Sequence, residues 1–170
     1  IDARKRKRIQ QTCSMLYKNC RCCAKFKQTT QSIQMNPCEM AKLHSLSGSQ
    51  TRPWSEIEYK KLLETTTSRL FYTENGFLVG RVIERDAEIL NVVIHPDYRR
   101  LGKASKLICM FEKEAKNAGS SRCFLEVAES NSSAKELYKA LGYLKVGQRN
   151  NYYKFVDGRK DDAAILSKEI

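Results

Sequence analysis

The stretch HPDYRRLGKASKLI, at residues 95–108, gathers two arginines and two lysines around one glycine. A strand-like apolar run ends before it at Ile94 and an amphipathic helical run follows it, so the loop leads into a helix N-terminus. The free N–H groups and the dipole at a helix start bind anions, and Gly102 lets the backbone approach a ligand closely. The pattern Arg99-x-x-Gly102-x-Ala104 therefore predicts a phosphate-binding loop. A solvated basic helix start is the alternative.

Nucleic acid is another candidate partner for this loop, because the formal net charge of the whole chain is +12. Residues 1–34 hold nine Lys and Arg against the single acid Asp2, so they carry +8 of it and residues 35–170 carry +4. We therefore expect a basic, disordered extension at 1–34 and one folded domain at 35–170. Nucleic-acid binding remains open for the extension, and the domain requires no direct nucleic-acid contact.

The numbers and spacing of cysteine and histidine indicate whether the chain binds a metal ion and in which cellular compartment it works. The seven cysteines include one C-x-x-C, at Cys20 and Cys23, but no second pair at zinc spacing, and there are only two histidines. We therefore expect no metal site. No apolar run approaches the roughly 20 residues of a membrane span, and no secretory signal pattern is present. An odd number of cysteines then fits reduced thiols and a cytoplasmic protein.

The order of elements that must position the loop can be predicted from periodicity and turn residues. Two short helices are expected first, at 35–44 and after Ser55, which opens a capping box with Glu58. Strands, helices and turn signals then alternate, and Gly119 and Gly142 are expected to end the two later helices. The expected order is strands at 69–74, 76–84 and 87–94, a helix at 102–118, a strand at 122–127, a helix from Ser133, and closing strands at 143–153 and 162–166. This order implies an α/β fold with a mixed sheet.

The loop residues match the Q/R-x-x-G-x-G/A pyrophosphate loop of the GNAT superfamily of N-acetyltransferases. Longer stretches resemble one group within it, the RimI group of ribosomal-protein-alanine N-acetyltransferases, in the same order: RPWSE (52–56), NVVIHPDYRRLG (91–102), LEVAESNSSAKELYKALGY (125–143) and NYYKFVDGRKDDAAIL (151–166). The resemblance covers residues 35–170 and leaves 1–34 without a counterpart. It implies the GNAT fold, a mixed central sheet flanked by helices, with acetyl-CoA as co-substrate.

The resemblance also implies the site. Glu126 would be the general base and Tyr138 the general acid. The cofactor would be held by a strand end, by the loop and by one helix start: Val92, Val93, Ile94, Arg99, Arg100, Leu101, Gly102, Lys103, Ala104, Ser105 and Asn131. The peptide entrance would be lined by Trp54, Tyr152 and Tyr153.

Each of these side chains also has an ordinary structural reading. Glu126 fits a strand-end glutamate that faces solvent, and Tyr138 lies on the apolar stripe of its helix. Asn131 fits a helix N-cap, and Trp54 fits a hydrophobic staple with the helix after Ser55. The two tyrosines fit packing at a sheet edge. The residues alone leave these alternatives open.

The implied activity is transfer of an acetyl group from acetyl-CoA to a protein N-terminus, by direct attack of the deprotonated amine on the thioester. The resemblance names the N-terminal alanine of the eighteenth small-subunit ribosomal protein as the acceptor. We expect a monomer, with no membrane partner. One alternative keeps the fold but acetylates a small-molecule amine. Another is a ribosome- or RNA-binding module with an idle CoA site, for which a salt-dependent RNA affinity of residues 35–170 would speak.

Overall fold

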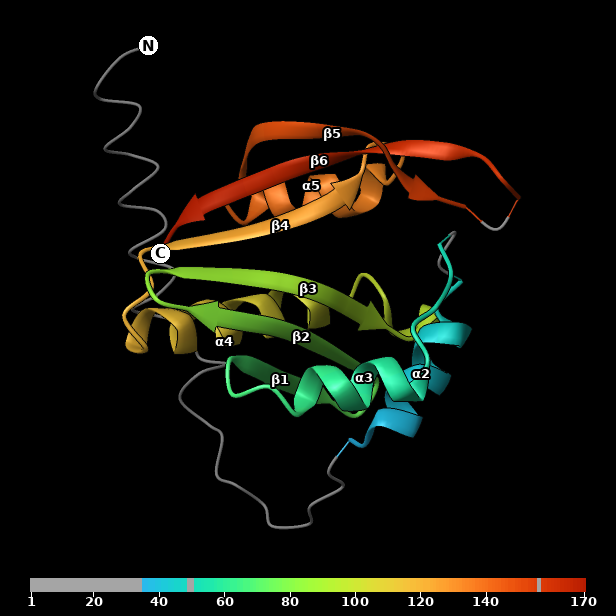
Figure 1. Ribbon diagram of the computed structural model, residues 1–170, viewed down its shortest axis with the longest axis horizontal. Helices are drawn as coiled ribbons and strands as arrows, with labels where there is room; N and C mark the ends of the chain where they lie inside the picture. Colours follow the sequence, from blue (N-terminus) through green and yellow to red (C-terminus); the bar gives the residue numbers. More distant parts are fainter. Residues whose placement is uncertain (1–34, 49–50, 156) are drawn as a thin grey trace. The chain divides into compact units, whose positions relative to one another are not determined.

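The computed structural model describes residues 35–48, 51–155 and 157–170, within the compact unit Met35–Ile170 (Figure 1). The basic extension expected at 1–34 lies outside these residues. The elements follow in the predicted order: α2 (Pro37–Leu46), α3 (Glu56–Leu63), β1 (Ser68–Thr73), β2 (Gly76–Ile83), β3 (Asp86–Ile94), the 3-10 turn η1 (Pro96–Tyr98), α4 (Lys103–Asn117), β4 (Arg122–Ala128), α5 (Ser132–Ala140), β5 (Leu144–Lys154) and β6 (Lys160–Glu169).

Local capping signals explain where the helices begin. Ser55 and Glu58 form the predicted capping box at the start of α3. The starts of α2 and α5 differ from the prediction. α2 begins at Pro37, after the N-cap Asn36. α5 begins at Ser132, because the side chain of Asn131 accepts the bond from the N–H of Ala134 and caps the helix before Ser133 is reached. Asparagine and serine are comparable N-caps, so the sequence alone does not choose between them.

The six strands form one sheet in the order β1-β2-β3-β4-β6-β5. Of the neighbouring pairs, only β3 and β4 run parallel, as expected for strands joined through a helix crossover. This arrangement confirms the predicted mixed sheet. The parallel pairing is short, since it runs from Asp86 opposite Arg122 to Ile89 opposite Leu125 and then stops.

A β-bulge explains why β3 and β4 separate after Ile89. On β2, Val79 pairs with Asn91 while the next residue, Gly80, pairs with Ile89, so Leu90 is an extra residue on β3. A bulge bends its strand and interrupts the ladder. From Leu90 onward, β3 therefore presents an edge toward β4 that β4 does not pair with.

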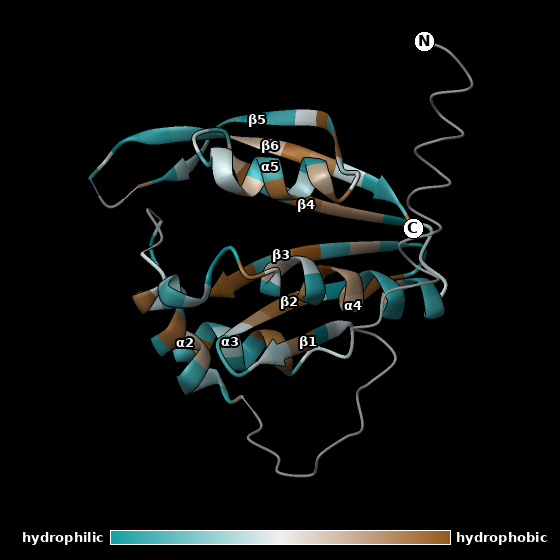
Figure 2. Cartoon of the chain, turned by 180° about the vertical axis from the view of Figure 1, so that it is seen from behind, coloured by the Kyte–Doolittle hydropathy of each residue, from teal (hydrophilic) through white to brown (hydrophobic). Residues whose placement is uncertain are grey.

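Helices cover the two faces of the sheet unequally. On one face α4 and α5 pack on a core of buried side chains: Leu78, Ala87, Ile89, Ile94, Leu107, Ile108, Phe111, Ala115, Cys123, Leu125, Val127, Tyr138, Tyr143, Ala164 and Leu166 (Figure 2). On the other face α2 and α3 cover β2 and β3. The smaller core between them consists of Met40, Tyr59, Phe77, Val79 and Val93. On this second face, the residues of β4, β5 and β6 belong to neither core.

Two further properties concern partners outside the chain. None of the described helices has the length and apolar character needed to cross a bilayer. Within the described ranges, no group of three or more His, Cys, Asp and Glu side chains is placed to hold a metal ion. The C-x-x-C of Cys20 and Cys23 lies outside those ranges.

Candidate active site

The loop between η1 and α4 has the backbone of an anion cradle. Arg100 has φ +61° and Gly102 has φ +72°, both in the left-handed region, and such turns direct successive N–H groups into a concavity. Gly102 is the N-cap of α4 and makes no side-chain capping bond. The first-turn N–H groups, those of Lys103, Ala104 and Ser105, therefore have neither a helical partner nor a cap. A Cβ at Gly102 would meet nothing within 4 Å, so the space over this helix start is open.

Some side chains of the loop lie near the helix start, whereas Arg99 bonds to backbone carbonyls of the protein. Lys103 lies with its Nζ 5.0 Å from the centre of the Tyr98 ring, close to the helix start, and Arg100 and Leu101 are exposed. Arg99 reaches elsewhere: its Nε donates to the carbonyl of Ile94 at 3.3 Å, and its Nη2 donates to the carbonyl of Ser47. The guanidinium of Arg99 therefore fastens the end of α2 to the end of β3, and its predicted role toward the cofactor stays a prediction.

The edge of β3 beyond the bulge offers backbone groups to a ligand. The N–H of His95 donates to the carbonyl of Asn75 on the β2 side, and the direction alternates along an antiparallel strand. Val93 therefore faces β2, whereas Val92 and Ile94 direct their N–H groups to the side where β4 no longer pairs. Two of the three predicted strand residues thus present amides where an extended ligand could bind. The amide of Val93 points away from that side.

Glu126 lies on the face of the sheet that the helices leave open. The side chains of Leu125 and Val127 enter the core under α4 and α5, so Glu126 between them points to the opposite face. Its side chain is 18% exposed, and its Oε1 lies 2.8 Å from Nε of Arg149. The same carboxylate is the main reason that the pKa of the Tyr152 phenol is raised. Glu126 is therefore a half-enclosed carboxylate in an ion pair, rather than a glutamate free in solvent.

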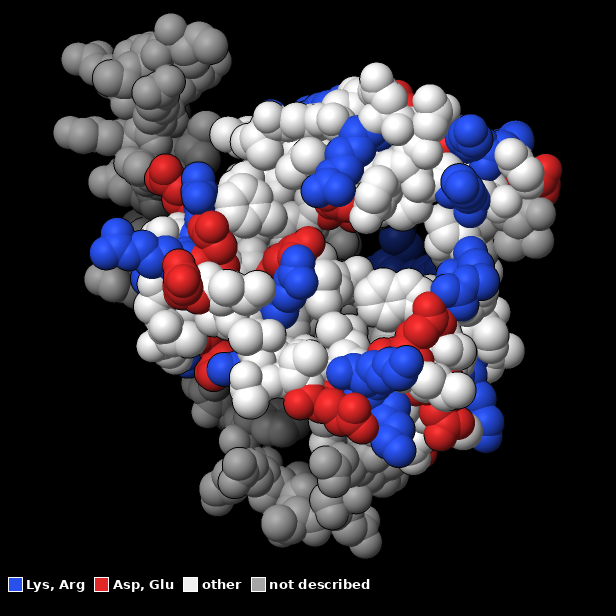
Figure 3. Space-filling view, in the orientation of Figure 1, with Lys and Arg blue, Asp and Glu red and all other residues white. Residues whose placement is uncertain are grey.

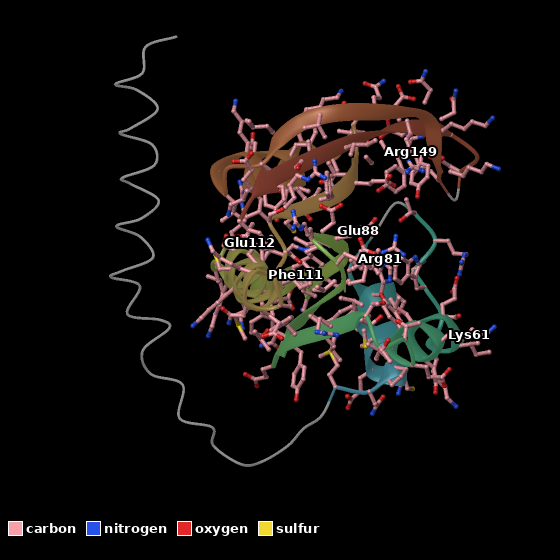
Figure 4. The ribbon with its side chains drawn as sticks, turned by 60° about the vertical axis from the view of Figure 1, so that its left-hand side comes forward. Lys61, Arg81, Glu88, Phe111, Glu112 and Arg149 are labelled. Carbon is pink, nitrogen blue, oxygen red and sulfur yellow. The ribbon has the colours of Figure 1, made fainter. Side chains whose placement is uncertain are left out.

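A hollow of about 340 Å³ adjoins this carboxylate, lined by Arg81, Ile83, Asp86, Ala87, Glu88, Phe124, Leu125, Glu126, Arg149 and Ile165. Across it, Arg81 and Glu88 form a second ion pair, with Nη2 2.6 Å from Oε2. Figure 4 shows Arg149 on the upper strands and Glu88 and Arg81 below it, away from Phe111 and Glu112. Basic and acidic side chains lie next to one another on the face that Figure 3 shows. The hollow can therefore receive a polar group beside Glu126.

Tyr138 lies in the core on the α4 and α5 face, with 8% of its surface exposed. Its ring meets that of Tyr143 edge to face, with centroids 5.7 Å apart. Burial, followed by the neighbouring Tyr153, raises the pKa of Tyr138 above its ordinary value of 10. The phenol therefore keeps its proton, and the core position that the apolar stripe predicts is confirmed.

The predicted entrance residues come from two segments that touch. Thr51 forms an isolated antiparallel bridge with Phe155, which joins the segment before α3 to the β5–β6 hairpin. Trp54 contacts Tyr59 at 5.4 Å between ring centroids, as the staple predicts, while Tyr152 and Tyr153 meet edge to face at 5.2 Å. The structure thus brings the three aromatic residues onto two segments that this bridge joins.

One contact of the site has no clear signal in the sequence, and one predicted contact stays untested. Arg149 was not among the predicted residues, because only the register of β5 against β6 and β4 reveals that it meets Glu126. Asn131 is a cap through its side-chain oxygen, which leaves any cofactor contact of this residue untested.

The fold, the loop and the separated strands define a family. Residues 40–143 match the model of the Acetyltransferase (GNAT) family, and the chain belongs to that family and is an acetyltransferase. It is 33% identical over 122 residues, 69% of this chain and 82% of the relative, to the [Ribosomal protein bS18]-alanine N-acetyltransferase of Escherichia coli K12. It is 34% identical, over 68% and 79%, to the putative enzyme of that name from Bacillus subtilis.

Comparison of the folds points to the same family. The crystal structure of the ribosomal-protein-S18-alanine N-acetyltransferase from Escherichia coli superposes with a TM-score of 0.68 and 27% identity, covering 76% of this chain and 84% of the other. The predicted GNAT fold is therefore confirmed.

Proposed function

We propose that this chain transfers the acetyl group of acetyl-CoA to the N-terminal α-amine of a protein, and that its acceptor is the N-terminal alanine of the eighteenth small-subunit ribosomal protein. The observation that carries the proposal is the placement of Glu126 in the hollow beside the point where β3 and β4 separate. The names of the relatives supply the acceptor. A ribosomal substrate implies the cytoplasm as the working compartment.

Acetyl-CoA supplies an activated acetyl thioester. The open helix start of α4, with Arg100, Gly102 and Lys103, would bind its pyrophosphate. The N–H groups of Val92 and Ile94 would hold the extended pantetheine arm and polarise the thioester carbonyl. These groups are preorganised, because the bulge at Leu90 leaves them facing away from β2.

An α-amine must lose its proton before it attacks. A peptide α-amine has a pKa near 8, against about 10.4 for a lysine side chain, so its deprotonation at neutral pH costs less. Glu126 would accept this proton, directly or through one water molecule. This difference in pKa favours a protein N-terminus over a side-chain amine.

Tyr138 would assist departure of the thiolate. A phenol with a raised pKa is a weak acid, and a thiol has a pKa near 8.5. A hydrogen bond from the phenol is therefore the stronger expectation than complete proton transfer. The proposal needs no second copy of the chain, because every group it uses belongs to one chain.

The test incubates the full chain with acetyl-CoA and peptides that begin with Ala, Met, Ser or Gly, beside spermidine, and follows product by mass spectrometry. Acetylation of the Ala peptide at its α-amine is expected. A preference for spermidine would support a small-molecule acetyltransferase, and no turnover with any acceptor would support the idle CoA site. Glu126→Gln is expected to lower turnover by about a hundredfold. Unchanged turnover in this variant would remove Glu126 from the role of base.

A further inference from the structure

Arg149 and Tyr152 lie together next to Glu126, although strand geometry should separate them. Side chains alternate between the faces of a strand, so residues three apart lie on opposite faces. Yet Nε of Arg149 lies 2.8 Å from Oε1 of Glu126, and the same carboxylate raises the pKa of Tyr152. The guanidinium also lies 5.3 Å from the centre of the Tyr152 ring. Some local feature of β5 must bring both onto one face.

That feature is an irregularity in the pairing of β5 with β6. Arg149 pairs with Ala163 and Tyr153 pairs with Asp161, so the three residues 150–152 lie opposite the single residue Asp162. Asn151 has φ +53°, a left-handed conformation that asparagine tolerates better than most residues. Extra residues in one strand change the direction of the side chains that follow. The bulge thus turns Tyr152 to the face that Arg149 already occupies.

Asp162 holds the bulge in place. Its Oδ1 accepts from the backbone N–H of Asn151 at 2.8 Å, and its Oδ2 accepts from the side-chain amide of Gln148 at 2.7 Å. The Asp162 carboxylate therefore bonds to one residue before the bulge and to one residue within it. The Asp162 carboxylate bonds to Gln148 and Asn151 rather than to Glu126, so it acts on Glu126 through the shape of β5.

We propose that Arg149 is a positioning residue that fixes the carboxylate of Glu126 for proton transfer, and that Tyr152, turned against its guanidinium by the bulge that Asp162 holds, supports it. The inference rests on the proposed function, because it assigns Glu126 the role of base. A carboxylate in a close ion pair with a guanidinium has less rotational freedom than one in solvent, and the ring of Tyr152 packs against that guanidinium. Tyr152, predicted from the resemblance as a wall of the entrance, gains a second role.

The chain offers a matched control for Arg149. Arg122 also lies on a strand, has a carboxylate partner in Asp86 with Nη2 3.3 Å from Oδ1, and lies 4.8 Å from the centre of the Phe124 ring. The two arginines are similarly exposed, at 53% and 57%. Arg122 pairs with Asp86 rather than with Glu126.

The test is a double-mutant cycle on turnover. Arg149→Gln is expected to lower kcat by about tenfold with little change in KM for the peptide. Arg149→Lys should recover part of the loss, and Arg122→Gln should change kcat by less than about twofold. In a Glu126→Gln background, Arg149→Gln should cause no further loss. Asp162→Ala should reproduce the Arg149→Gln effect in the wild-type background and lose it in the Glu126→Gln background.

Equal losses from Arg149→Gln in both backgrounds would overturn the inference, because Arg149 would then act independently of Glu126. A rise in KM with unchanged kcat would also overturn it and make Arg149 a contact for the peptide. If no acceptor is acetylated at all, the proposed function fails, and crystal structures decide the positioning role. In those structures Glu126 should change orientation in Arg149→Gln and keep it in Arg122→Gln. An unmoved Glu126 in Arg149→Gln would overturn the inference independently of activity.

Discussion

Glu126 and Tyr138 lie on opposite faces of one sheet. Glu126 points to the face on which the helices leave β4, β5 and β6 uncovered. Tyr138 lies in the core under α4 and α5. The pairing of β3 with β4 stops at Ile89 and Leu125, next to Glu126 in the chain. A group that passes between the separated strands could therefore meet a carboxylate on one side and a phenol on the other. This placement fits a base on the acceptor side and a proton donor on the cofactor side.

The phenol can be tested without disturbing the core. Tyr138→Phe is expected to lower kcat by about tenfold or more and to leave the Kd for acetyl-CoA nearly unchanged, because only the hydroxyl is removed. Stopped-flow acetyl transfer and calorimetric titration measure the two quantities. Tyr143→Phe is the control, since its hydroxyl donates to Sγ of Cys123 at 3.1 Å, and it should affect stability more than rate. A selective loss of acetyl-CoA binding in Tyr138→Phe would reassign Tyr138 to the cofactor.

Arg99 and Arg100 are neighbours in the loop, and their contacts predict different defects. Arg100→Ala should weaken acetyl-CoA binding, more so at low salt, because its exposed charge acts on a polyanion. Arg99→Ala removes two hydrogen bonds to the carbonyls of Ile94 and Ser47, so it should lower stability by about 1–2 kcal/mol. Calorimetric titration and urea unfolding separate the two effects. Equal stability of the two variants would show that the Arg99 contacts contribute nothing.

The elements could be predicted because their signals are local. The capping box at Ser55 forms as expected, and the predicted glycine stops, Gly119 and Gly142, adopt φ +96° and +92°. A Gly-rich or polar turn of this kind is decided by a few neighbouring residues. The start of α5 shows where such signals stop, since Asn131 and Ser133 are both competent caps and only the folded backbone selects Asn131.

The two bulges could not be predicted, because each depends on a partner strand. Leu90 reads as one more apolar residue of its run, and residues 150–152 read as part of a continuous closing strand. Their extra positions exist only relative to β2 and β6. Both shape the site, since one exposes the amides of Val92 and Ile94 and the other turns Tyr152 to the face where Arg149 meets Glu126. The resemblance therefore indicated Glu126 but not its ion pair with Arg149.

A buried histidine predicts how stability depends on pH. The backbone N–H of Trp54 donates to Nδ1 of His44 at 3.1 Å, and an N–H group can only donate, so Nδ1 carries no proton. The hydroxyl of Tyr59 lies 2.7 Å from the same atom and accepts from Asn91 at 3.0 Å. Burial, and then the charge of Arg52, lowers the pKa of His44 from 6.5.

Because the folded-state pKa of His44 is below the unfolded value, the unfolded chain binds more protons as the pH falls through about 6.5. The free energy of unfolding should therefore decrease between about pH 7.5 and about pH 5.5. His44→Asn, which keeps an acceptor near Nδ1 but does not titrate, should reduce this decrease. His95→Asn is the control, because His95 lies in the loop beside Asp97. The same pH dependence in wild type and His44→Asn would exclude His44 as its source.

Gly80 predicts how tightly α4 packs on the sheet. A Cβ there would lie 2.5 Å from two ring carbons of Phe111 and 2.7 Å from the carbonyl oxygen of Glu88. Gly80→Ala should therefore destabilise the fold by about 1–3 kcal/mol, seen as a lower urea midpoint. Gly147→Ala is a matched strand control, because its Cβ would approach no atom closer than the 3.4 Å to Ile165. Equal midpoints for the two variants would mean that α4 and Glu88 can move aside, and that the β2–α4 contact is looser than these distances require.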